Sequence, residues 1–163
     1  MNEIAVRFGQ VFWGLLLVIL DLSVNGLDLL PDVIGYVLVA VGLGGLTSLS
    51  EQFATAQTYA RVLVPFALLT WLPLGELGWV LRLVHLGLHC AMMWFLLGGI
   101  MDYATARNRP DLAEHASTRR LAYILLTCLV TFVGSAAIIL VCLVALLIMI
   151  LHLIHRVKTE LAT

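Results

Sequence analysis

The sequence has very little charge. Only 12% of its 163 residues are charged, 62% are hydrophobic, and the mean hydropathy is +1.06. A soluble domain of this length needs a charged exterior to stay dissolved, and it could not bury so much apolar surface. The composition therefore excludes a soluble globular domain and predicts an integral membrane protein whose main partner is the lipid bilayer.

Clusters of basic residues are also lacking. Nine Lys and Arg residues against ten Asp and Glu residues give a formal net charge of −1. No stretch of the chain has the basic stripe that proteins use to neutralise the phosphates of a nucleic acid. Nucleic acid is therefore excluded as a partner.

Cysteine is scarce, and the familiar catalytic motifs are absent. The three cysteines lie inside apolar runs without any C-x-x-C spacing, which argues against a disulfide framework and a zinc knuckle. The sequence contains no Walker loop, no G-x-S-x-G elbow, no H-E-x-x-H and no kinase signature. Whether the protein is an enzyme stays open, but no motif favours it.

Long apolar runs are what the sequence does contain. They lie at about residues 5–22, 33–49, 60–75, 79–101 and 121–153. The last run would form a helix about 50 Å long, whereas the hydrocarbon core of a bilayer is about 30 Å thick. Because Gly134 and Ser135 near its middle could form a turn, this run could also be two short spans, 121–133 and 136–153.

The positions of the basic residues favour six spans over five. Short loops rich in Arg and Lys stay on the cytoplasmic side of a membrane during insertion. Six spans place every cation of the loops on one side, whereas five would separate Arg156 and Lys158 from the others. We therefore predict an all-α polytopic membrane protein with six transmembrane helices in three hairpins, cytoplasmic N- and C-termini, a cytoplasmic loop at 102–120 and a single domain over residues 1–163.

Part of the second hairpin is similar in sequence to part of the first. Residues 34–46 align without gaps with residues 77–89 and share a Gly, the aromatic residue after it, a Val-Leu pair and a later Val, Leu and Gly. The offset covers two spans, so the repeats would run parallel to each other. This alignment predicts a duplicated hairpin.

Acidic residues are concentrated at the outer connection of the first hairpin. A turn at Asn25-Gly26, with Pro31 opening the next helix, would explain them structurally, because the helix dipole favours an anion at Asp32. Alternatively, their spacing of i, i+4, i+7 and i+11 would place them on one helical face. Such an oxygen-rich face would suit a cation or proton uptake. The four candidate residues are Asp21, Asn25, Asp28 and Asp32.

Two histidines lie deep in the fourth run. His85 and His89 are spaced i, i+4 and share a helical face, with Arg82 on approximately the same side. They could be neutral groups that hydrogen-bond between helices, or a pathway carrying protons or cations inward from the aspartates through Arg82. A third possibility is a Zn or Mn site formed by His85, His89, Asp28 and Asp32. Haem is disfavoured because two histidines one turn apart cannot clasp opposite faces of a porphyrin.

The stretch D-L-L-P-D-V-I-G-Y, residues 28–36, resembles a motif of small, uncharacterised integral membrane proteins of bacteria. The likeness covers only the first hairpin. It implies a multi-pass protein of the bacterial inner membrane, and it assigns no catalytic residue.

Three functions are compatible with these features. The leading hypothesis is a small transporter or channel-like protein that handles a proton or a metal cation at the Asp and His residues named above. The alternative is a non-catalytic accessory or scaffold subunit that forms a homo-oligomer or binds a larger membrane partner, with G-L-G-G at 42–45 allowing close helix contact. The third is a membrane enzyme acting on lipid or quinone.

Overall fold

The chain is all-helical over the part that the computed structural model describes, which is residues 3–20, 31–69, 75, 77–133 and 137–161. No strand occurs in these ranges. The helices are α1 (Glu3–Leu20), α2 (Pro31–Gly44), α3 (Glu51–Leu69), α4 (Leu77–Ala106), α5 (Pro110–Val133) and α6 (Ala137–Glu160). The predicted all-α class and the six helices are confirmed.

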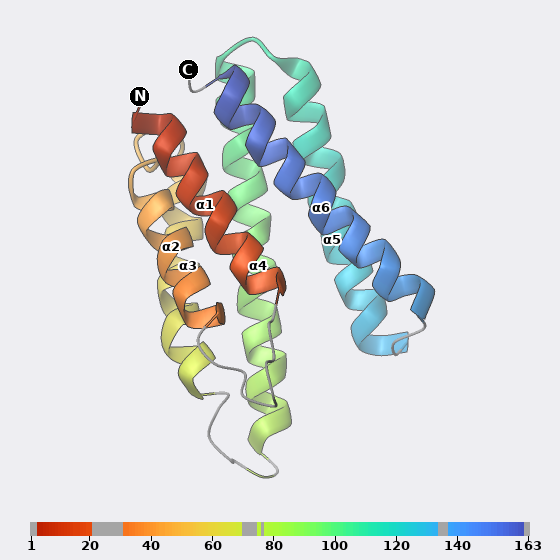
Figure 1. Ribbon diagram of the computed structural model, residues 1–163. Helices are drawn as coiled ribbons and strands as arrows, with labels where there is room; N and C mark the ends of the chain where they lie inside the picture. Colours follow the sequence, from red (N-terminus) through yellow and green to blue (C-terminus); the bar gives the residue numbers. More distant parts are fainter. Residues whose placement is uncertain (1–2, 21–30, 70–74, 76, 134–136, 162–163) are drawn as a thin grey trace.

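The six helices run alternately up and down (Figure 1). Each packs against the next in the chain, and α6 returns to pack against α1 and α4. The start of α1 and the end of α6 therefore lie at one end of the bundle, which we call the termini end; the other is the distal end. Because α5 and α6 are separate and pack together, the run 121–153 forms two helices. The turn expected at Gly134-Ser135 lies outside the described residues.

Two of the described helices are long and apolar enough to cross a membrane. They are α4 and, over Val141–Glu160, α6, and the apolar stretch Asp32–Gly44 of α2 is shorter. By length and composition, two candidate membrane-crossing segments are present in the described ranges. The six spans predicted from the positions of the basic residues stay a prediction.

The connection between α4 and α5 is much shorter than the loop expected at 102–120. Only residues 107–109 lie outside the helices. Asn108 has a positive φ of 55°, and the amides of Asn108 and Arg109 donate to the carbonyls of Thr105 and Ala104, each at 3.0 Å. This is the Schellman arrangement that ends a helix, and Pro110 then suits the first turn of the next one. The polar composition of this segment reflects two exposed helix ends and not a long loop.

Glycines bring α1 and α2 unusually close together. A Cβ atom on Gly14 would lie 2.6 Å from the Gly35 carbonyl oxygen, and one on Gly42 would lie 2.8 Å from the Arg7 carbonyl oxygen. Gly44 and Gly45 face the side chains of Gln57 and Arg7 in the same way. The G-L-G-G stretch thus makes close contacts within the chain, and the homo-oligomer or membrane partner stays a prediction.

The packed core lies mainly toward the termini end. Phe8 of α1 contacts the rings of Phe53 and Tyr103 at centroid distances of 6.0 and 5.9 Å. Leucines and isoleucine of α4 complete this core, and all are buried: Leu96, Leu97 and Ile100. The distal half of α4 instead exposes large apolar side chains, namely Leu77, Trp79, Val80, Leu83 and Val84.

Candidate functional site

The hydroxyl group of Tyr36 lies between the two histidines of α4. It is 3.2 Å from His85 Nε2 and 2.8 Å from His89 Nδ1, both within hydrogen-bond distance. The Tyr36 side chain is 1% exposed, and its ring meets the two imidazoles edge-on at 5.7 and 5.8 Å. The three side chains form one hydrogen-bonded group, the Tyr36 site, that joins α2 to α4.

Local sequence places each member of the Tyr36 site. The i, i+4 spacing puts His85 and His89 on one face of α4, as predicted, because both reach the same hydroxyl. On α2, Gly35 packs against Gly14 of α1. That contact fixes the rotation of α2 about its axis, so the next residue, Tyr36, turns toward α4.

A single hydroxyl proton restricts how the Tyr36 site can be protonated. Tyr36 can donate to only one imidazole and must accept from the other. If it donates to His89 Nδ1, at the shorter distance, His85 must carry its own proton on Nε2. The Nδ1 atom of His85 is then an acceptor, and it is buried without a hydrogen-bond partner among the described residues. Two proton arrangements of opposite direction are therefore available to the same three side chains.

Helix α5 closes the site on a third side. The ring of Tyr123, which is 4% exposed, lies 6.1 Å from the imidazole of His89. Asp32 is half-buried one turn before Tyr36 on α2, so the two share a helical face. The Tyr36 site is thus enclosed by three helices, with one carboxylate on its distal side.

The remaining predicted site residues are not gathered around the histidines. Asp21, Asn25 and Asp28 lie outside the described residues. Arg82 is exposed, and within the described ranges it forms no ion pair. In the same ranges no three His, Cys, Asp or Glu side chains are placed to share a metal ion. His85, His89 and Asp32 are therefore not a metal-binding set by themselves, and because Asp28 lies outside the described residues the Zn or Mn site stays a prediction.

Tyr36 was not singled out from the sequence, although a signal for it exists. It is the last residue of the D-L-L-P-D-V-I-G-Y stretch and lies about one turn inside an apolar helix. A phenol in such a helix needs a hydrogen-bond partner for its hydroxyl. The two histidines are the natural partners, but only the three-dimensional arrangement, in which the Tyr36 side chain reaches α4, identifies them.

Charged side chains pair with one another at the termini end. Arg109 Nε lies 3.0 Å from Asp111 Oδ1, and Arg156 Nε lies 2.7 Å from Glu160 Oε1. Arg109 also pairs with Glu160, which joins the start of α5 to the end of α6. The hydrogen bond from Arg109 lowers the pKa of the Asp111 carboxyl from its ordinary value of 3.8 to about 2.

A second polar cluster lies between α3, α4 and α5. Ser50 donates to Asp102 Oδ2 at 2.6 Å, and its Oγ atom accepts from the Gln52 amide at 3.1 Å, which caps the start of α3. The Arg120 guanidinium lies 3.5 Å from the centroid of the Trp94 ring. These contacts hold helices together, and we assign them a structural role.

Comparison with known protein families, with curated proteins and with solved structures found no match to this chain. The resemblance of the first hairpin to small bacterial membrane proteins therefore stays a prediction.

Proposed function

We propose that the protein crosses a membrane with all six helices and relays protons through Tyr36, His85 and His89. The observation that carries the proposal is the position of the Tyr36 hydroxyl, within hydrogen-bond distance of both imidazoles. This proposal is the proton version of the hypothesis that the protein transports a proton or a metal cation. It requires no set of metal ligands.

Two features support the membrane setting. Large apolar side chains are exposed on every helix, among them Trp13, Val41, Val62, Leu125 and Ile148. Exposed apolar surface on this scale is normal only where lipid or another protein covers it. The ion pairs of the described residues all lie at the termini end, as expected if that end faces the cytoplasm.

The Tyr36 site can move a proton in three balanced steps. A proton from the distal side binds His85 Nδ1, which has no hydrogen-bond partner among the described residues. The resulting imidazolium releases its Nε2 proton to the Tyr36 oxygen, and Tyr36 passes its own proton to His89 Nδ1. The positive charge has then moved from His85 to His89. After His89 releases a proton, the starting state returns when the protons of the two imidazoles and of the hydroxyl move back to their original atoms. Imidazole suits this role because it titrates near neutral pH.

The same geometry also supports a purely structural role, in which neutral imidazoles hydrogen-bond to Tyr36 and hold α2 against α4. The two roles differ in one measurable respect. A relay requires that protons cross the membrane when a driving force is applied, whereas a structural contact does not.

Proton flux in liposomes tests the proposal. Purified protein is reconstituted with a pH-sensitive dye inside, and flux is driven by a potassium diffusion potential. We expect wild-type flux above that of empty liposomes and a decrease of about tenfold or more in Tyr36→Phe and His89→Gln, because each removes a proton-transfer group. Tyr59→Phe is the matched control: Tyr59 stacks on Phe95 at 5.6 Å, and its hydroxyl makes no hydrogen bond to the described residues.

The result that overturns the proposal is equally definite. Wild-type flux equal to that of empty liposomes, or Tyr36→Phe flux equal to that of Tyr59→Phe, would leave the Tyr36 site with its structural role. Circular dichroism and thermal unfolding of each variant in detergent separate a loss of relay from a loss of fold.

A further inference from the structure

Lys158, the only lysine of the chain, has a different environment from its basic neighbours. Arg156 and Arg109 pair with carboxylates, and Arg107 lies 5.3 Å from the centroid of the Tyr103 ring. The Lys158 ammonium makes no ion pair or hydrogen bond within the described ranges. It lies instead over Gly9 of α1, where an added Cβ atom would be 3.3 Å from Nζ.

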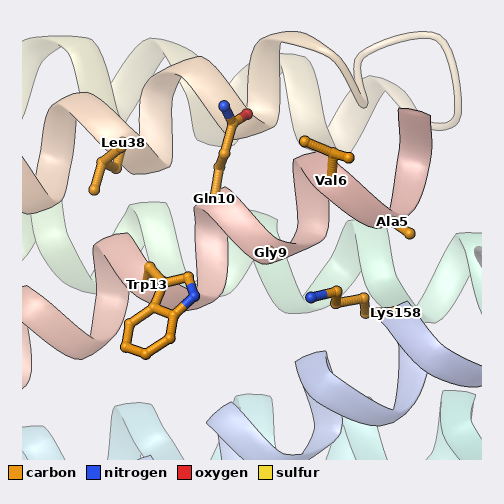
Figure 2. Close-up of a pocket in the computed structure, with 7 residues that line it drawn as sticks. All are labelled: Ala5, Val6, Gly9, Gln10, Trp13, Leu38 and Lys158. Carbon is orange, nitrogen blue, oxygen red and sulfur yellow. The ribbon is translucent and has the colours of Figure 1, made fainter. Parts of the chain in front are cut away.

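The lysine projects into a groove formed by three helices. This groove has a volume of about 440 Å³ and is lined by Ala5, Val6, Gly9, Gln10, Trp13, Leu38 and Lys158. Figure 2 shows the Lys158 side chain reaching from α6 toward Gly9, with Trp13 one turn further along α1. Gly9 leaves the floor hollow because it has no side chain. The lining is apolar except for the ammonium of Lys158, the amide of Gln10 and the indole N–H of Trp13.

The chemistry of this lining identifies an amphipathic, anionic occupant. The Lys158 ammonium, which has no charge partner among the described residues, calls for a negative charge, while Val6, Leu38 and the Trp13 ring offer apolar contact. The groove uses the start of α1 and the end of α6, so it lies near the termini end, where apolar surface gives way to charge. Lys and Trp at this level are the residues that proteins use toward lipid headgroups.

We propose that the groove between α1, α2 and α6 binds an anionic phospholipid, with the phosphate at Lys158 and an acyl chain along Val6 and Leu38. The Trp13 indole, on the same side of α1 as Lys158 in Figure 2, supplies a further N–H donor for the headgroup. This inference shares only the membrane setting with the proposed function and does not involve the Tyr36 site.

Native mass spectrometry of the purified full chain tests the inference. Phosphatidylglycerol and phosphatidylcholine with identical acyl chains compete at equal concentration. We expect wild-type protein to retain phosphatidylglycerol preferentially, and the preference to fall about fivefold in Lys158→Gln, since one basic residue near a lipid surface contributes a factor of that order. Lys158→Arg keeps the charge and should keep the preference. Gly9→Leu fills the groove and should reduce binding of both lipids.

Arg61→Gln is the matched control for charge. Arg61 also forms no ion pair with the described residues, but it lines a separate groove between α2 and α3. Its removal should leave the preference unchanged. Equal retention of both lipids by wild type, or the same loss in Arg61→Gln as in Lys158→Gln, overturns the inference. Because proton flux through the Tyr36 site is a separate measurement, lipid binding and relay can fail independently.

Discussion

The two halves of α4 differ sharply in what surrounds them. Toward the termini end, Gly99 packs against Phe53, and Leu96, Leu97 and Ile100 are fully buried. Toward the distal end, Leu83 and Val84 are exposed, and a Cβ atom on Gly87 would have no neighbour within 4 Å. The packing of the first half fixes the fold. The second half leaves these large apolar side chains exposed, and its described polar contact to α2 is the Tyr36 site.

The strongest test of this contrast is a pair of glycine substitutions on α4. A Cβ atom at Gly99 would lie 2.6 Å from ring carbons of the buried Phe53. Overpacking of a core costs about 1–3 kcal/mol or more, so we expect Gly99→Leu to lower the midpoint of denaturant unfolding strongly or to prevent folding. Unfolding in detergent, followed by circular dichroism, measures it.

Gly87→Leu is the control, because it makes the same chemical change in open space. We expect stability within about 0.5 kcal/mol of wild type or slightly higher, since leucine favours a helix by several tenths of a kcal/mol over glycine. Equal destabilisation by the two substitutions would show that the halves of α4 are packed alike, contrary to the comparison.

The next largest effect concerns the Tyr36 site as a structural contact. Tyr36→Phe removes the hydroxyl and leaves nitrogen atoms of both half-buried imidazoles without their partner. A buried polar group that loses its partner costs about 1–3 kcal/mol. We expect a stability loss at the low end of this range for Tyr36→Phe and almost none for Tyr59→Phe, measured by thermal unfolding. A Tyr36→Phe protein as stable as wild type would mean that the hydroxyl contributes no net hydrogen bond.

The division of the chain into six helices could be predicted from the sequence, because the apolar runs and the positions of the basic residues between them mark the helix boundaries. The split of the run 121–153 into two helices followed from Arg156 and Lys158, although neither Gly134 nor Ser135 is a decisive turn signal. The extent of α4 and α5 could not be predicted in the same way. Polar residues after position 101 indicated a loop, whereas the Schellman arrangement at Asn108 and the Pro110 start compress it into residues 107–109.

The candidate site was predictable only in part. Helical spacing alone placed His85 and His89 on a common face. Their partner Tyr36 lies on another helix, 49 residues before His85 in the chain. No local pattern specifies which aromatic residue faces which helix. That choice depends on the Gly14–Gly35 contact, which turns α2 about its axis.

The ion pairs at the termini end should contribute less than the packing beneath them. Glu160 pairs with Arg109 and Arg156, and the carboxylate and both guanidinium groups are about one-third exposed. Exposed pairs of this kind contribute little and are screened by salt. We expect Glu160→Gln to lower Tm by about 1–2 °C at low ionic strength. The decrease should be smaller in about 0.5 M salt, because the Debye length there is well below 10 Å and exposed charges are screened. A decrease that is unchanged by salt would assign the effect to packing.

The smallest expected effect is a dependence of stability on pH at Asp111. Its pKa in the folded protein is about 2, below the ordinary value of 3.8, because Arg109 donates to the carboxylate. As pH falls through 3.8 the unfolded chain takes up a proton before the folded protein does, so the stabilisation is full above about pH 5 and is lost toward pH 2. Asp111→Asn cannot take up this proton. The Tm difference between wild type and Asp111→Asn should therefore be about 1 °C at pH 5, should shrink as pH falls and should vanish below about pH 2. A constant difference across this range would show that the Arg109 pair adds nothing to the fold.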